Sequence, residues 1–255
     1  MAFEQSVSWW CIARDNSDLV DMLGTCKAIG YTGMELVPVE QFQLVRDQGM
    51  KIVTHQLHGP IPVGINDPAN WDDIKRQAEA NLKLAVEWDI PFLIAFSGNR
   101  DGMDDGRGAE NAIKHLELLA RDAESAGVVL ILELLNSKVN HPDYMCDSTA
   151  WGVQVVSAVN SPHARLLYDI YHMQVMEGDV IQTIRDNHQW FAHYHTAGVP
   201  GRNEIDESQE LYYPAICRAI AETGFTGYVG QEFLPLGDWK ATLQYAYEAC
   251  NVDLL

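Results

Sequence analysis

Residues 165–202 read RLLYDIYHMQVMEGDVIQTIRDNHQWFAHYHTAGVPGR and contain the pattern that decides the fold. Two short apolar runs, at 165–170 and 191–196, flank a stretch that we predict to be helical at about 179–188. This pattern is typical of two parallel strands joined by a helix. Asp169 and His195 stand where the two runs end, and parallel α/β barrels present their chemistry at that end of the strands.

Runs of the same kind recur through the whole chain, and helical stretches alternate with them. We predict strands at 6–10, 33–37, 51–58, 91–98, 128–134, 165–170, 191–196 and 228–233. We predict helices at 17–29, 39–48, 71–88, 109–126, 149–159, 179–188, 211–224 and 238–250. This alternation favours one (β/α)8 TIM barrel over residues 1–255, a usual length for that fold. An open doubly wound sheet is disfavoured, because no glycine-rich phosphate turn follows an early strand.

Charge and composition exclude several classes of partner. The chain has 36 acidic and 17 basic residues, which give a formal net charge of -19. A field of this sign repels nucleic acid and anionic membranes, so we expect neither as a partner. The sequence shows no leader-peptide pattern and no run long enough to span a bilayer, which favours a cytoplasmic protein. The five cysteines are odd in number and show no CxxC spacing, so we expect them to be reduced and mostly buried.

Four residues predict a metal site. Glu133, Asp169, His195 and Glu232 are separated by 36, 26 and 37 residues, each close to the length of one βαβ repeat. We therefore expect them at the carboxyl ends of the fifth to eighth strands. Three carboxylates and an imidazole that converge there would repel one another unless a cation lay between them. Oxygen-rich ligands favour Mn²⁺ or Mg²⁺, and Co²⁺ would fit as well.

Other polar residues are candidates for contact with a substrate. His172 follows Asp169 by three residues, and Arg202 lies in the loop after the seventh strand, so both would face the metal. The planar fork of Arg202 suits a carboxylate, although an exposed loop arginine is the alternative. Lys138 and Asn136, after the fifth strand, are weaker candidates.

Further histidines and tryptophans allow two interpretations. His55 and His58 end the third strand, where they could line the pocket. Strand alternation puts His193 on the same face as His195, as a ligand, as a partner of a ligand or as a core histidine. We interpret Trp9 and Trp10 as strand residues of the core.

The motifs LLYDIYHMQVMEGD, VPGRNEID, LELLNSK and GYVGQEF resemble the hydroxypyruvate isomerase family, within the xylose-isomerase-like barrel superfamily that also contains ketose 3-epimerases. The resemblance implies that Glu133 and Glu232 ligate the metal and also move protons. It implies that Asp169 is a ligand and that His172 and Arg202 contact the substrate. It allows a homo-oligomer, since barrels of this group often associate. Residues 193–195 depart from the family's HxQ pattern and match the HxH of the epimerases.

A metal site with two glutamates suits proton transfer at a carbon next to a carbonyl, through an enediolate that the metal stabilises. The first hypothesis is an isomerase that converts hydroxypyruvate, or a similar small hydroxy-keto acid, into its aldehyde isomer. The alternative is a 3-epimerase of a ketose or keto-sugar, or a lyase or dehydratase with the same glutamate pair. The charge of the chain argues against phosphodiester cleavage. The presence of both glutamates argues against a non-catalytic sugar-binding barrel.

Overall fold

The computed structural model describes residues 2–252 and confirms the predicted TIM barrel. Its parallel strands form a closed barrel in the order β1 to β8. The strands are β1 Glu4–Ser8, β2 Gly33–Glu35, β3 Lys51–Gln56, β4 Phe92–Ala95, β5 Val129–Glu133, β6 Ala164–Asp169, β7 Phe191–Thr196 and β8 Tyr228–Gln231. Each parallel connection requires a crossover, which the intervening helices supply.

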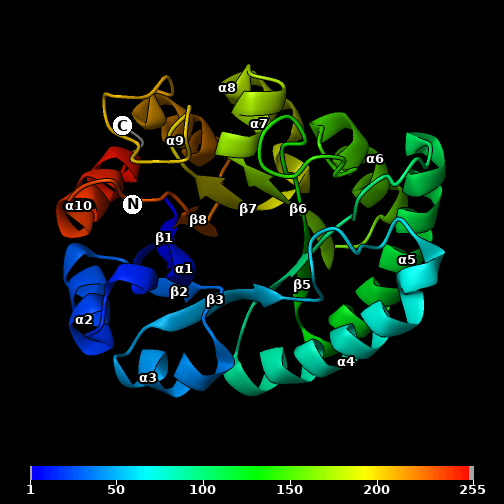
Figure 1. Cartoon of the computed structure of the whole chain (residues 1–255), viewed down its shortest axis with the longest axis horizontal. Helices are drawn as coiled ribbons and strands as arrows, with labels where there is room; N and C mark the ends of the chain where they lie inside the picture. Colours follow the sequence, from blue (N-terminus) through cyan, green and yellow to red (C-terminus); the bar gives the residue numbers. More distant parts are fainter. Residues whose placement is uncertain (1, 253–255) are drawn as a thin grey trace. The chain divides into compact units, whose positions relative to one another are not determined.

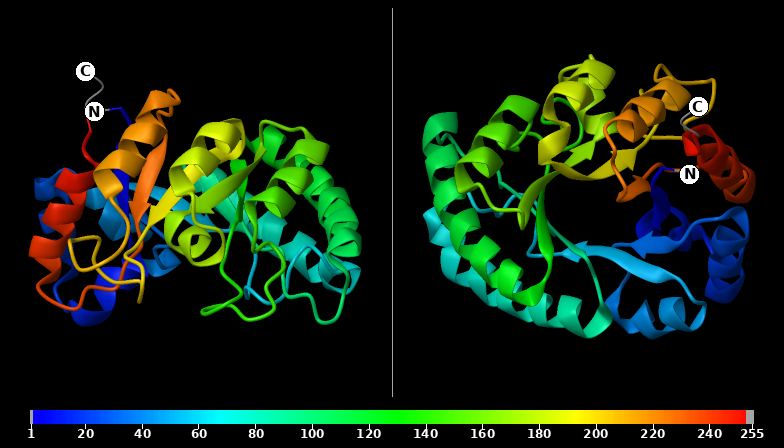
Figure 2. Two further views of the ribbon diagram at one scale, coloured as in Figure 1. Left: turned by 90° about the horizontal axis from the view of Figure 1, so that it is seen from above. Right: turned by 180° about the vertical axis from the view of Figure 1, so that it is seen from behind.

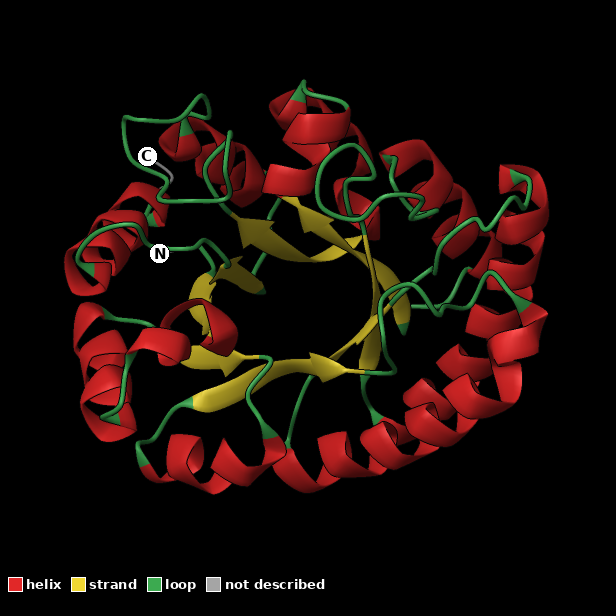
Figure 3. Ribbon diagram, in the orientation of Figure 1, coloured by secondary structure: helices red, strands yellow, loops and turns green. Residues whose placement is uncertain are grey.

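The α-helices alternate with these strands (Figures 1 and 3). They are α1 Trp9–Ile12, α2 Leu19–Ile29, α3 Phe42–Asp47, α4 Trp71–Trp88, α5 Asp105–Ala126, α6 Thr149–Val159, α7 Ile170–Met176, α8 Val180–Asn187, α9 Tyr213–Glu222 and α10 Trp239–Cys250. Short 3-10 helices occupy Ala13–Asp15, Val39–Gln41, Pro68–Asn70 and His188–Trp190. Among residues 2–252, no helix is both long enough and apolar enough to cross a membrane.

The chain divides into two compact units, of which the larger comprises residues 54–178 and 189–192. In this unit α5 contacts both α4 and α6, and each of the three helices also contacts a neighbouring strand (Figure 1). The helix α5 begins at Asp105, although the sequence pattern predicted a start at 109. Its first turn is rich in glycine and therefore resembles a loop, but the Asp104 carboxylate accepts hydrogen bonds from the N–H groups of Gly106 and Arg107 and caps the helix.

The second unit comprises residues 1–53, 179–188 and 193–255, of which the structure describes those from residue 2 to residue 252. The strands β7, β8, β1 and β2 pair in that order. The helices α2 and α10 lie side by side in this unit, as Figures 1 and 2 show. Of the cysteines, Cys11, Cys26, Cys146, Cys217 and Cys250 are all free and buried, as predicted.

Two further predictions of local structure were wrong, and both concern segments close to the candidate residues. The strand predicted at 6–10 ends at Ser8, and Trp9 and Trp10 begin α1 instead. The segment after Asp169 was not predicted as a helix, yet α7 begins there. The Asp169 side chain accepts a hydrogen bond from the His172 N–H at 2.8 Å, so the last residue of β6 is also the N-cap of α7.

Candidate active-site residues

His195 and Glu232 form the centre of a polar cluster in the second unit. His195 is the fifth residue of β7, and Glu232 directly follows β8; both side chains are buried. The Glu232 N–H donates to the Thr196 carbonyl at 3.0 Å, which continues the strand pairing one residue beyond β8. His195 Nδ1 lies 3.1 Å from Glu232 Oε2. Parallel pairing thus brings together two residues that are separated by 37 positions in the sequence.

Arg202 and Trp10 hold the same carboxylate from the loop after β7 and from α1. The Arg202 guanidinium donates to Glu232 Oε2 and forms an ion pair with it. Trp10 Nε1 donates to Glu232 Oε1 at 3.2 Å, and the Arg202 guanidinium lies 5.2 Å from the centre of a Trp10 ring. The interpretation of Trp10 as a core strand residue was therefore wrong: its side chain is 36% exposed and contacts two candidate site residues.

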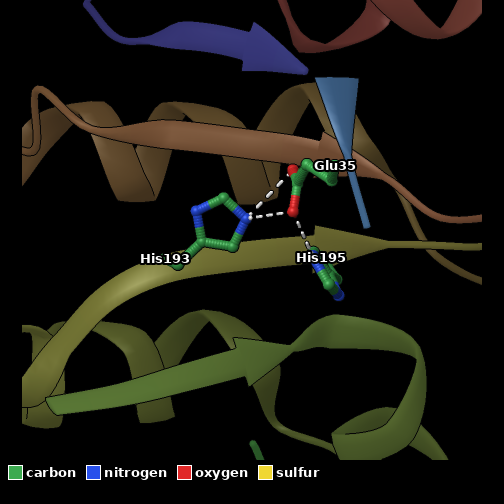
Figure 4. Close-up of side chains that lie close together, drawn as sticks. All are labelled: Glu35, His193 and His195. Carbon is green, nitrogen blue, oxygen red and sulfur yellow. Dashed lines mark hydrogen bonds and ion pairs between the residues drawn. The ribbon is translucent and has the colours of Figure 1, made fainter. Parts of the chain in front are cut away.

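Glu35, which the sequence analysis did not single out, lies at the end of β2 and contacts both histidines of β7 (Figure 4). His193 Nε2 lies 3.0 Å from Glu35 Oε2, and His195 Nε2 lies 3.0 Å from the same oxygen. Burial raises the pKa of the Glu35 carboxyl, but attraction to His193 and His195 and their hydrogen bonds outweigh burial and hold this pKa well below its usual value. The expectation that His193 and His195 share a face is confirmed.

Glu133 and Asp169 are buried strand-end residues of the larger unit. Glu133 is the last residue of β5, and Asp169 is the last residue of β6. The hydroxyl of Tyr144, from the loop after β5, donates to the Glu133 carbonyl at 2.9 Å and accepts from the Ser97 N–H at 3.0 Å. Two strand ends and one loop are therefore joined through a single buried hydroxyl.

His172 is buried in the first turn of α7, directly beside Asp169. Its Nδ1 accepts a hydrogen bond from the Asn136 main-chain N–H at 3.0 Å. A neutral ring must then carry its proton on Nε2, which lies 3.8 Å from Asp169 Oδ2. His172 can therefore act as an N–H donor on the side of the carboxylate.

Lys138 and His58, the other two residues predicted to contact the substrate, form hydrogen bonds with main-chain groups. The exposed Lys138 donates to the carbonyls of Val175 and Met176 at 3.1 and 2.9 Å, at the C-terminal end of α7, where a cation is favoured. His58 is buried and accepts from the Phe96 N–H at 3.2 Å. Burial lowers the pKa of His58 to about 4. Substrate contacts for Lys138 and His58 remain predictions.

Comparison with known proteins identifies the class. The family model described as xylose isomerase-like TIM barrel matches residues 23–249. The chain therefore belongs to the xylose isomerase-like TIM barrel family.

Two named relatives are similar to this chain. A protein of Xenopus laevis named "Putative hydroxypyruvate isomerase" is 33% identical over 129 residues, which make up 51% of this chain and 47% of that protein. The chain thus spans about half of the length of that relative. A 2-oxo-tetronate isomerase of Pectobacterium atrosepticum is 26% identical over 229 residues, with 85% of this chain and 87% of the relative covered.

Solved structures share the fold. The crystal structure of an AP endonuclease, family 2, from Brucella melitensis superposes with a TM-score of 0.84 at 23% identity, covering 95% of this chain and 98% of the other. A D-psicose 3-epimerase from Clostridium cellulolyticum H10, solved with D-tagatose, superposes with a TM-score of 0.73 at 18% identity, with 95% and 89% covered. At these identities the likeness concerns the barrel alone.

Proposed function

We propose that this chain is an isomerase that moves a proton at a carbon next to a carbonyl, and that it uses a divalent cation held by two glutamates, an aspartate and a histidine. The donors are Glu133, Asp169, His195 and Glu232. One observation carries the proposal: these four buried residues stand at the carboxyl ends of β5, β6, β7 and β8, which are successive strands of the closed barrel. The isomerase names of the relatives support it.

The donor chemistry fits a hard divalent cation. Three carboxylates and one imidazole match Mn²⁺ or Mg²⁺, and Co²⁺ is compatible with the same set. Within the second unit, His195 Nδ1 faces Glu232 Oε2 at 3.1 Å, and two hydrogen-bond acceptors at that distance require a proton or a cation between them. When bound, the metal would supply Lewis-acid stabilisation of negative charge on substrate oxygens.

Individual side chains carry out the proton transfer and hold the substrate. One glutamate of the pair Glu133 and Glu232 removes the proton next to the carbonyl, and the other returns a proton to the enediolate. The guanidinium of Arg202 carries five N–H donors in a planar fork, so it can hold Glu232 and a substrate carboxylate together. His172, with its proton on Nε2, donates to a substrate oxygen. A small hydroxy-keto acid such as hydroxypyruvate or 2-oxo-tetronate supplies both the carboxylate and the acidic carbon.

Epimerisation of a ketose or keto-sugar at C3 is the second candidate function. It is favoured by His195, since residues 193–195 read His-Tyr-His rather than HxQ. The same pair of carboxylates could serve the two faces of one carbon. A panel of hydroxypyruvate, 2-oxo-tetronate and free ketoses, each assayed with Mn²⁺, separates the two functions by which compound is turned over.

The test of the glutamate pair uses Glu133→Gln and Glu232→Gln, with the exposed Glu40→Gln as the matched control. Both buried variants should lose at least about 10²-fold in kcat, the lower range for one acid–base group, whereas the control should retain wild-type turnover. Wild-type enzyme in deuterium oxide should exchange the substrate hydrogen with solvent only when Mn²⁺ is present. Substantial turnover by either purified buried variant would contradict the two-glutamate scheme.

A further inference from the structure

Glu35 gathers several hydrogen-bond donors around one fully buried carboxylate. Its Oε2 lies 3.0 Å from Nε2 of both His193 and His195, and its Oε1 accepts from the Ser6 hydroxyl. A carboxylate has about four acceptor positions, so three donors can be accommodated together. The Glu35 side chain comes from β2, the histidines from β7 and Ser6 from β1, as Figure 4 shows for the labelled three.

The space for this carboxylate is created by a glycine. Gly230 of β8 lies between Ser6 of β1 and His195 of β7 in the strand register. A Cβ atom on Gly230 would overlap Glu35 Oε1 and would come within 3.0 Å of the His195 ring. The interior of β8 therefore lacks a side chain at the point where the Glu35 carboxylate approaches it.

Glu35, His193 and His195 also have the donor types for a cation. Hydrogen bonds account for the cluster without one, because each contact pairs a carboxylate oxygen with a group that can donate a proton. His195 Nε2 is then the protonated ring nitrogen. In a neutral ring Nδ1 consequently carries the lone pair, and it is Nδ1 that faces Glu232 Oε2 at 3.1 Å.

We propose that Glu35 is the positioning residue of the metal site: by accepting from Nε2–H, it fixes the tautomer and the ring orientation that present Nδ1 of His195 to the cation. This inference rests on the proposed function for the existence of the metal. Metal-ligating histidines commonly donate their second N–H to a carboxylate, and loss of such a partner typically weakens metal binding by about 10–100-fold. In this role Glu35 would hold the ligand His195 and would not itself be a ligand.

Calorimetric titration of the metal-free protein with Mn²⁺ is the first test. Glu35→Gln loses the charge, and its single carbonyl oxygen cannot accept from His193, His195 and Ser6 together. We expect its Kd for Mn²⁺ to rise by about 10–100-fold, while the exposed Glu40→Gln retains the wild-type Kd. Gly230→Ala is a second variant that keeps every polar group and displaces the carboxylate, and it should weaken binding in the same direction. Circular dichroism establishes that each variant is folded.

The second test reads the tautomer in the wild-type protein and therefore requires no variant of Glu35. Long-range ¹H–¹⁵N spectra of histidine-labelled protein, with His195 assigned by the signal lost in His195→Asn, should show a protonated Nε2 and an unprotonated Nδ1 in the Mg²⁺ form. An unprotonated Nε2, or a folded Glu35→Gln protein with wild-type Mn²⁺ affinity, would overturn the role of Glu35. Failure of wild-type protein to bind Mn²⁺ would instead overturn the proposed metal site, and the metal-free spectrum would still report whether Nε2 is protonated.

Discussion

Replacement of His58 by glutamine should make the protein less sensitive to acid. His58 is buried, and its Nε2 accepts a hydrogen bond from the Phe96 N–H at 3.2 Å. A glutamine carbonyl oxygen can accept this bond in the place of the ring nitrogen, so His58→Gln keeps the Phe96 N–H satisfied and removes the titration.

The size of the expected change in the free energy of unfolding follows from the shift of the His58 pKa. Burial lowers the pKa of His58 from 6.5 to about 4. Between these values the unfolded chain binds a proton that the folded protein does not, so stability rises with pH through this window. The contribution is complete above about pH 6.5 and is lost as the pH falls towards 4. This difference between the pKa values of the unfolded and folded states corresponds to about 3 kcal/mol of free energy of unfolding.

Urea denaturation of wild type and His58→Gln at pH 7.5 and pH 4.5 measures this contribution. Other buried groups also titrate, and they do so in both proteins, so the quantity of interest is the difference between the two acid-induced losses. The wild type should lose about 2–3 kcal/mol more than the variant between the two pH values. Equal losses in both proteins would refute the assignment of His58 as a histidine buried in its neutral form.

Three further substitutions test a buried hydroxyl, a helix cap and a close main-chain contact. Tyr144→Phe removes the hydroxyl that bridges two strand ends and should lower the free energy of unfolding by about 1–3 kcal/mol in urea titrations, whereas Tyr212→Phe, at an exposed ring, should change it little. Asp104→Ala removes the cap of α5 and should cost about 1 kcal/mol in the same assay. Gly64→Ala would place a Cβ against main-chain atoms and should lower the melting temperature, whereas Gly24→Ala has open space in α2 and should raise it. An unchanged melting temperature in Gly64→Ala would show that the strand-end loops can adjust.

The elements predicted best are those whose signals are local. The helices α4 and α6 and the strand β7 have the predicted bounds, since apolar periodicity and flanking polar residues mark them in the sequence. The helix α1 has only four residues and follows a strand without a break, so its tryptophans resemble a continuation of β1. Tertiary contacts such as that of Trp10 with Glu232 lie outside the reach of a local pattern.

The candidate residues were predictable to the extent that they end apolar runs. Glu133, Asp169, His195 and Glu232 all do so, and repeat spacing assigned each to its strand. Glu35 ends a run as well, within GMELV, but its strand has three residues and its partners on β7 are 158 and 160 positions away. Its role depends on the pairing of β7, β8, β1 and β2, which no window of the sequence contains.

That pairing explains why a glycine stands in β8. Along the register, Ser6, Gly230 and His195 form one row across three strands, and only the middle residue lacks a side chain. A glycine in a strand interior weakens the strand, so its presence indicates that another group approaches closely. Here that group is the Glu35 carboxylate, which reaches His195 through the gap. The strand register therefore places the Glu35 carboxylate against His195.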